Sequence, residues 1–140
     1  MTENRKQQLF SIVERLPIQT LDEKLHYLST ACYFNSGTEH DDRCRPVALF
    51  HDLVEDGYID LDTLAAQAKL NQLQIEAIDN LTRKKKEDYF DYIKRLKPDD
   101  IASRVKLADL TDNIRRCAHD LPIKLSLLER YVKAYKLLTV

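Results

Sequence analysis

A histidine and three carboxylates follow directly on an apolar run near the middle of the chain. Val47-Ala48-Leu49-Phe50 leads into His51-Asp52, and Glu55-Asp56 comes two residues later. In a helix over 46–56, side chains three and four positions apart share one side of the last turn. The negative end of the helix macrodipole disfavours each carboxylate there by roughly 0.3–1 kcal/mol. The cluster therefore favours a cation, and imidazole together with carboxylates suits Mn²⁺ or Fe²⁺ and also accepts Mg²⁺.

A solvated helix end is the alternative interpretation of this segment. Charged helix ends are common, and many of them are simply hydrated. The apolar run before His51 indicates that the helix is already buried where the cluster begins, which favours the cation site. From this segment alone both interpretations stay open.

A second candidate group lies in the segment ASRVKLADLTDNIRR. In a helix, the polar side chains of Lys106, Asp109 and Asn113 would lie on one face. Val105, Ala108 and Asp112 would lie beside them. The face next to Asp109 is thus partly apolar, and a carboxylate in such surroundings needs a partner. The alternative is a Lys106–Asp109 ion pair at the surface, which is common and contributes little. The periodicity alone favours that alternative.

Three further histidines stand at His26, His40 and His119. His26 falls within a predicted helix and can face inward, where a satisfied core residue is the commoner outcome than a metal ligand. His40 lies in the acidic stretch EHDD, which we expect to be an exposed loop. His119 follows a predicted helix end and could interact with that end through the helix dipole.

Taken together, these groups resemble the HD-domain metal-dependent phosphohydrolases. The pattern of that superfamily is a helical His, an adjacent His-Asp pair and a distant Asp, which together bind one metal. Here the four ligands would be His26, His51, Asp52 and Asp109, and the resemblance extends from about Leu25 to Arg116. It implies an all-α, multi-helix HD-domain bundle and a divalent metal cofactor, with Mn²⁺ as the favoured ion.

A narrower resemblance is to the hydrolase domain of RelA/SpoT-type alarmone enzymes and their small stand-alone relatives. It is carried by His51-Asp52-Leu53-Val54-Glu55-Asp56 and by the later segments LTRKKKEDYFDYIKRL and VKLADLTDNIR. The resemblance implies that Glu55 and Asp56 act on the attacking water, and that Lys106 and Asn113 line the substrate pocket. Arg104 and the basic run from Arg83 to Lys86 could offset phosphate charge. For the run 83–86, a solvated turn is an equally good interpretation.

Three functions are consistent with these residues. The first is metal-dependent hydrolysis of a nucleotide phosphate or pyrophosphate, with a (p)ppGpp-like 3′-pyrophosphate as the favoured substrate. The second is a 5′-nucleotidase that acts on monophosphates. The third is a catalytically degenerate HD domain that senses a nucleotide without turnover. The segment LPIQTLDEKLHYLS around His26 motivates the third, because it has one basic residue, Lys24, and no glycine, where the family usually carries a basic, glycine-containing segment.

The elements that must position these residues are predicted to be helices throughout. Apolar residues recur at helical spacing, and with only two glycines the chain offers little for strands and tight turns or for a Gly-rich phosphate loop. The first expected helix covers about 4–16, and the second begins at the capping box Thr20-Leu21-Asp22-Glu23 and ends at about 35–37. The third covers 46–56 and is ended by Gly57, and the fourth begins at Asp60 or Asp62 and ends at about 70. The remaining helices are expected over 71 to about 81, about 89–96, 98 to about 116, and from Pro122 onward.

Length and composition bound the remaining possibilities. The 140 residues suit a single domain, 1–140, and a composition of 44% apolar and 32% charged residues is unlike that of a disordered chain. The net charge of −1 gives no general attraction for DNA, RNA or an anionic membrane. Three cysteines without a Cys-x-x-Cys pair, and no signal peptide or membrane-spanning run, predict reduced thiols in a cytoplasmic protein. We expect a small-molecule nucleotide partner and a monomer or homodimer, since the apolar stripe of the last helix either packs in the core or pairs with a second copy.

Overall fold

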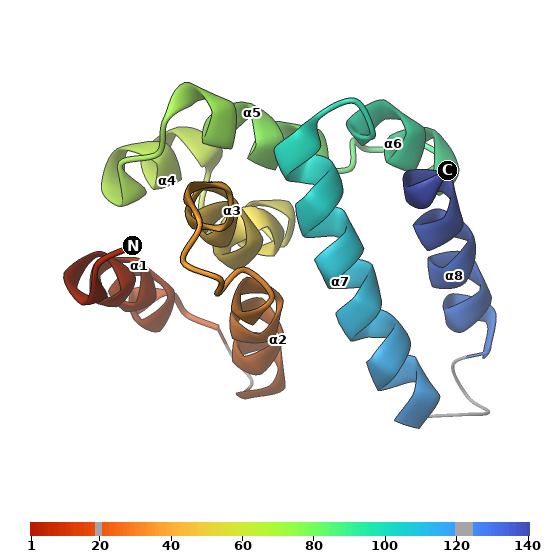
Figure 1. Ribbon diagram of the computed structural model, residues 1–140, viewed down its shortest axis with the longest axis horizontal. Helices are drawn as coiled ribbons and strands as arrows, with labels where there is room; N and C mark the ends of the chain where they lie inside the picture. Colours follow the sequence, from red (N-terminus) through yellow and green to blue (C-terminus); the bar gives the residue numbers. More distant parts are fainter. Residues whose placement is uncertain (19–20, 120–124) are drawn as a thin grey trace.

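Eight α-helices and no strand make up the part of the chain that the structure describes, as the sequence predicted. The computed structural model describes residues 1–18, 21–119 and 125–140. The helices are α1 (Glu3–Arg15), α2 (Leu21–Cys32), α3 (Glu39–Glu55), α4 (Leu61–Ala68), α5 (Gln72–Leu81), α6 (Tyr89–Leu96), α7 (Asp100–His119) and α8 (Leu125–Thr139). In Figure 1, α3 lies in the middle of the bundle and packs against α2, α5 and α7, whereas α8 lies along α7.

The core is built around α3. Val47, Phe50 and Leu53 on this helix are fully buried. Apolar side chains of α5, α7 and their neighbours surround them, among them Ile78, Leu81, Val105 and Leu110. Burying each large apolar side chain contributes roughly 1.5–3 kcal/mol. The packing therefore holds the last turn of α3, which carries His51 and Asp52, against α2 and α7.

The start of α3 differs from the prediction. We expected the stretch EHDD to be an exposed loop and the helix to begin at residue 46, but α3 begins at Glu39 and Pro46 lies inside it. The hydroxyl of Thr38 accepts a hydrogen bond from the Asp41 amide at 3.2 Å and caps the helix. Acidic residues in the first turn favour the positive end of the dipole. These contributions keep the first turns helical although Pro46 removes one bond of the ladder.

His40 is consequently not in an exposed loop. It lies in the first turn of α3 and is half-buried, and its Nε2 is 3.6 Å from Asp100 Oδ2 at the start of α7. The prediction for His40 failed for the same reason as the start of α3: the polar residues that indicate a loop are also those that favour the first turn of a helix.

The end of α3 agrees with the prediction that Gly57 stops it. Gly57 has a φ of +81°, and its amide donates to the Val54 carbonyl at 3.1 Å. The Tyr58 amide donates to the Leu53 carbonyl at 3.0 Å, which completes a Schellman motif. This motif fixes where the chain leaves α3, directly after Glu55 and Asp56.

Other helix ends follow the expected capping residues in part. Asp60 caps α4 and Asn71 caps α5 with a complete capping box. The Asp99 carboxylate accepts from the Ala102 amide at 3.0 Å where α7 begins. This helix continues three residues beyond Arg116, so His119 is its last residue and does not follow its end. The predicted capping box at Thr20 and helix start at Pro122 lie outside the described residues.

Several sequence expectations concern the surface and termini of the bundle. α2 ends at Cys32, before the Asn35-Ser36-Gly37 stop that we expected. Cys32, Cys44 and Cys117 are free thiols, as predicted. One side of α8 packs inward through Ala134 and Leu138. Among the described helices, none combines the length and apolar character needed to cross a membrane.

Candidate metal centre

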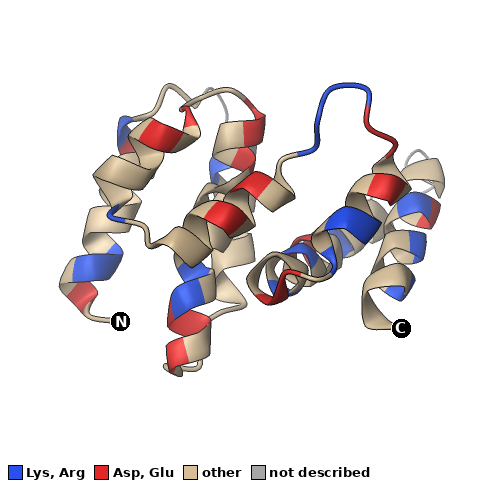
Figure 2. Ribbon diagram, turned by 90° about the horizontal axis from the view of Figure 1, so that it is seen from above, with Lys and Arg blue, Asp and Glu red and all other residues tan. Residues whose placement is uncertain are grey.

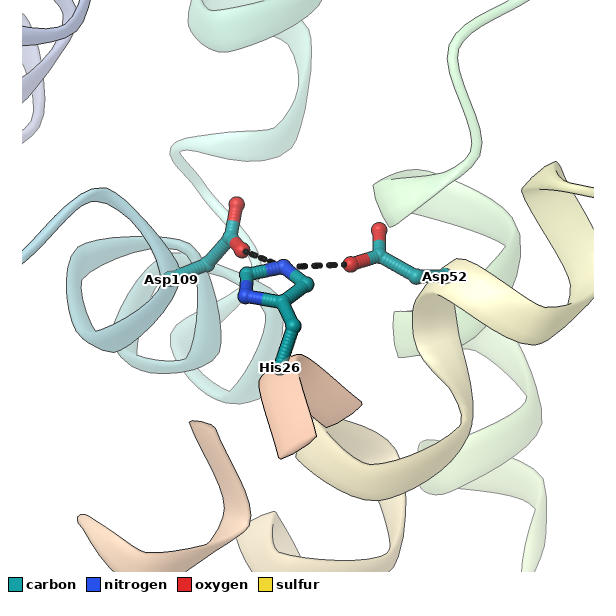
Figure 3. A group of neighbouring side chains, drawn as sticks. All are labelled: His26, Asp52 and Asp109. Carbon is teal, nitrogen blue, oxygen red and sulfur yellow. Dashed lines mark hydrogen bonds and ion pairs between the residues drawn. The ribbon is translucent and has the colours of Figure 1, made fainter. Parts of the chain in front are cut away.

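Three helices bring one ligand side chain each to a single point. His26 comes from α2, Asp52 from α3 and Asp109 from α7, and the imidazole points between the two carboxylates (Figure 3). His26 Nε2 lies 3.1 Å from Asp52 Oδ2 and 3.3 Å from Asp109 Oδ1. One nitrogen and two carboxylate oxygens of the group all lie within 4.8 Å of one another. The group could hold a metal ion.

His51 borders the same point from inside the core. It is only 1% exposed, and its Nδ1 lies 2.9 Å from the carbonyl oxygen of Ala48, one turn earlier on α3. A carbonyl accepts only, so Nδ1 carries a proton and Nε2 is the nitrogen that faces the cluster. His51 Nε2 is 3.1 Å from Asp52 Oδ1 and 3.9 Å from Asp109 Oδ1.

Two atoms of this group test whether it suits a cation. His51 Nε2 and Asp109 Oδ1 are buried and, within the described part of the chain, make no hydrogen bond of good geometry, although His/Asp neighbours lie 3.1–3.9 Å away. A buried polar atom without a partner costs about 1–3 kcal/mol. An ion coordinated by both atoms would remove that cost, and imidazole nitrogen with carboxylate oxygen is a donor set that divalent transition metals accept. The residues present therefore fit a metal.

The charged groups of the cluster shift one another's pKa values. Burial opposes a charge on His26, but the adjacent carboxylates of Asp109 and Asp52 outweigh it and raise the pKa of His26 to about 10. Burial likewise opposes a charge on His51, yet the charge of Asp52 raises the pKa of His51 to about 9. The pKa of Asp52 is lowered well below its usual value, because the charge of His51 and the His26 hydrogen bond outweigh its burial. Protons and a divalent ion would thus compete for the same atoms.

The Lys106–Asp109 pair exists, but it is not the surface pair that periodicity favoured. Lys106 is 8% exposed and Asp109 is 3% exposed, and Nζ donates to Asp109 Oδ2 at 2.9 Å. The ammonium group also lies 5.5 Å from the centroid of the Tyr92 ring. Periodicity could not reveal this burial, because it depends on the helices that pack against α7 and on the rings of Tyr89 and Tyr92, which lie near the ammonium.

Glu55 and Asp56 lie at the rim of the cluster. Both are exposed, and neither belongs to the three-residue ligand group. Partial loss of hydration, together with the charge of Asp52, raises the pKa of Glu55. The hydroxyl of Tyr27 donates to Asp56 Oδ2 at 2.5 Å, so α2 helps to hold this carboxylate. Their proposed action on water stays a prediction.

The remaining predicted substrate residues are spread over the bundle. Asn113 lies on α7 one turn beyond Asp109 and is half-buried. Arg104 lies elsewhere, since it is exposed and its Nε pairs with Asp100 Oδ1 at 3.4 Å near the start of α7. Figure 2 shows the run Arg83–Lys86 in the connection between α5 and α6. Arg83 itself turns toward the bundle, with its guanidinium carbon 5.5 Å from the centroid of the Tyr89 ring.

Sequence reasoning missed a cationic and aromatic group beside Lys106. The guanidinium carbon of Arg130 on α8 lies 3.6 Å from the centroid of the Tyr89 ring. The Tyr89 hydroxyl and Arg130 Nε are buried and make no hydrogen bond of good geometry in the described ranges, although the two side chains are in contact. Lys106 Nζ approaches the same ring at 5.9 Å. No spacing signal marks Arg130, because its position depends on which face of α8 packs on α6 and α7.

No protein-family model matches the chain, and no curated protein matches it significantly. Within the described residues, the chain is an eight-helix, all-α bundle with a buried His/Asp cluster. A cavity of about 530 Å³ lies away from that cluster, between α1, α2 and α3, and shares no residue with it.

Proposed function

We propose that the protein is a metal-dependent phosphohydrolase that acts on a nucleotide phosphate or pyrophosphate. The observation that carries this proposal is the convergence of His26, Asp52 and Asp109 from three helices on one point. The buried Nε2 of His51, which faces the same point and makes no hydrogen bond of good geometry among the described residues, supports a fourth ligand. A bound ion would be held by these four residues, and Mn²⁺ is favoured for mixed imidazole and carboxylate donors. When bound, such an ion supplies a water of lowered pKa and polarises a phosphoryl oxygen.

Glu55 is the residue that we assign to proton transfer. It follows the His-Asp pair by one helical turn, and its raised pKa brings its carboxyl closer to the neutral range in which a general base works. Asp56 orients the same water in this proposal, and its bond from Tyr27 supports a fixed carboxylate position. Exposure at the rim gives both carboxylates access to water.

The cationic and aromatic group next to the cluster is the proposed phosphate subsite. Lys106 joins it to the cluster, because its ammonium bonds to Asp109 and lies over Tyr89 and Tyr92. Arg130 Nε and the Tyr89 hydroxyl each have a hydrogen to donate, and phosphate oxygens are their natural acceptors. Arg83 adds a further positive charge near Tyr89. Asn113 stays a proposed contact of the nucleotide.

The order of the residues along the chain supports the choice of substrate. His26, the His51-Asp52 pair and Asp109, with Glu55-Asp56 after the pair, resemble the HD-domain hydrolases of the RelA/SpoT type. A nucleotide with a 3′-pyrophosphate, similar to (p)ppGpp, is therefore the favoured substrate. Its two adjacent phosphates would need more than one cation, and Lys106 and Arg130 both lie close to the Tyr89 ring to provide them.

The test is product analysis with the purified full-length chain, Mn²⁺ and a panel of (p)ppGpp, nucleoside monophosphates and triphosphates. We expect pyrophosphate release from (p)ppGpp and its loss in Asp52→Ala, whereas Asp79→Ala, which removes an exposed carboxylate of α5, should retain it. Orthophosphate release from monophosphates alone would show that the substrates are nucleoside monophosphates and not 3′-pyrophosphates. Nucleotide binding without any turnover would indicate a nucleotide-sensing domain that is not an enzyme, and it would contradict the proposal.

A further inference from the structure

One carboxylate beside the cluster is not among the four proposed ligands. Asp112 on α7 is 9% exposed, and it lies three residues after Asp109. We propose that Asp112, held by Ser29, is a positioning residue that turns His26 Nε2 toward Asp52 and Asp109. This inference rests on the proposed metal site and adds to it two residues that the ligand pattern does not contain.

A continuous chain of contacts connects Ser29 to the centre of the cluster. Ser29 Oγ donates to Asp112 Oδ1 at 2.6 Å. Asp112 Oδ2 lies 2.9 Å from His26 Nδ1. In Figure 3, both dashed lines from the carboxylates of Asp52 and Asp109 end on one ring nitrogen, which is Nε2, and none ends on the other nitrogen. Each oxygen of the Asp112 carboxylate therefore has its own partner, and the imidazole is held at both nitrogens.

The spacing of these residues explains why they meet. Ser29 follows His26 by three residues on α2, and Asp112 follows Asp109 by three residues on α7. Residues three apart lie on the same face of a helix. Because α2 packs against α7, these two faces oppose each other, and His26 lies between Asp109 and Asp112 of α7.

The chemical consequence concerns which nitrogen of His26 is available. A carboxylate without a proton is an acceptor only, so the contact with Asp112 places a proton on His26 Nδ1. The lone pair of the neutral ring is then on Nε2, which faces Asp52 and Asp109. His51 reaches the same state through the Ala48 carbonyl, so both imidazoles present Nε2 to one point. A partner on the far nitrogen of a ligating histidine fixes its tautomer and orientation.

A purely structural role would be to tie α2 to α7. Both roles predict some loss of thermal stability on substitution, because a buried carboxylate and its partners are removed. Only the positioning role predicts a change in the affinity of the folded protein for a metal. The variants must therefore be compared by metal binding and by unfolding of the same metal-free samples.

The experiment is calorimetric titration of the full-length protein with Mn²⁺ at one fixed, mildly alkaline pH. We expect Asp112→Ala to bind Mn²⁺ roughly tenfold to a hundredfold more weakly, the usual range for removing such a partner. Asp112→Asn should regain most of the affinity, because its amide oxygen still accepts from Nδ1–H. Ser29→Ala should cause a smaller loss. Ser11→Ala, which removes a hydroxyl on α1 away from the cluster, should leave the Mn²⁺ affinity unchanged.

Each outcome separates this inference from the proposed function. If the unchanged protein binds Mn²⁺ and folded Asp112→Ala binds it equally well, the positioning role is wrong while the metal site stands. If Asp112→Ala does not fold, Asp112→Asn and Ser29→Ala distinguish the two roles. Lowered stability with unchanged Mn²⁺ affinity in Ser29→Ala would mean that the contacts only hold α2 against α7. If the unchanged protein binds no Mn²⁺, the proposed function itself fails, and the inference fails with it.

Discussion

The two histidines of the cluster are held in different ways. His51 is anchored within its own helix, because its Nδ1 bonds to the main chain of Ala48 and the core packs around its ring. His26 is anchored across helices, since Asp112 of α7 holds its Nδ1 and its side chain is 14% exposed. The comparison shows that one half of the site depends on α3 alone, whereas the other half forms only when α2 packs on α7.

Removal of Asp109 should have the largest effect, because both halves meet at this residue. Asp109→Ala removes a proposed ligand and leaves the Lys106 ammonium buried without its carboxylate. Breaking a buried ion pair on one side costs about 3–5 kcal/mol. We expect complete loss of Mn²⁺ binding and a free energy of unfolding lowered by about this amount, measured by urea denaturation.

The double variant Asp109→Ala/Lys106→Met is the control for this effect. It removes the charge that the single variant leaves unpaired, so it should regain part of the stability but none of the metal binding. Equal stability of the single and double variants would show that Lys106 is not confined in the folded protein.

Replacement of the two histidines should separate the two halves of the site. His51→Ala opens a cavity in the core and should lower the free energy of unfolding by about 2–5 kcal/mol, as for other large core residues. His26→Ala should cost less, because its side chain lies at the edge of the core. Both should lose Mn²⁺ affinity. Thermal unfolding of the metal-free proteins measures the difference in stability between the two variants. A larger loss of stability in His26→Ala than in His51→Ala would contradict the different anchoring of the two histidines.

The dependence on pH follows from the raised pKa values of both histidines. His26 titrates at about 10 and His51 at about 9, so below these values each holds a proton that an ion must displace. Mn²⁺ affinity should rise with pH up to this range, by about tenfold per pH unit for each displaced proton. Calorimetry in buffers of different ionisation enthalpy measures how many protons are released when Mn²⁺ binds. An affinity independent of pH would exclude the displacement of protons by the ion.

The same shifts predict a pH dependence of the metal-free fold. A histidine whose folded pKa lies above its unfolded value of 6.5 contributes its full stability below that value. The contribution is lost as pH rises through the folded values of about 9 and about 10. The melting temperature of metal-free protein should therefore fall between neutral and alkaline pH, and His26→Ala should fall less steeply.

Gly57→Ala should have the smallest effect, and it tests whether α3 positions its half of the site by itself. Gly57 has a φ of +81°, and no atom would contact an added Cβ, so only backbone strain acts. We expect a loss of about 1 kcal/mol in the free energy of unfolding, with Mn²⁺ affinity unchanged, because the strain falls after the ligands. A loss of affinity as large as that of His26→Ala would show that the end of α3 is coupled to the ligands.

The sequence allowed prediction of those features that depend on neighbours along the chain. The His51-Asp52 pair, the stop at Gly57 and the caps at Asp60 and Asn71 all follow from local spacing and capping chemistry. The start of α3 was not predicted correctly, because polar residues at 38–42 are typical both of a loop and of the first turn of a helix. Pro46 favoured a helix that begins at residue 46, whereas α3 begins at Glu39.

Features that depend on packing between helices were not predictable in this way. The burial of the Lys106–Asp109 pair, the Asp112–His26 contact and the position of Arg130 over Tyr89 each need two or three helices to meet. Periodicity gives the faces of each helix, but it does not give the helix that a face contacts. The resemblance to HD-domain hydrolases suggested the four ligands, and the structure brings His26, Asp52 and Asp109 together.

Titration of the purified protein with Mn²⁺, followed by electron paramagnetic resonance, tests the metal centre most directly. The account predicts one bound ion per chain, loss of that ion in Asp52→Ala and its retention in Asp79→Ala. Asp79 is a suitable control because its carboxylate is exposed and pairs only with the exposed Lys84 among the described residues. No bound ion, or an ion that survives Asp52→Ala, would contradict the assignment of the His/Asp cluster as a metal centre.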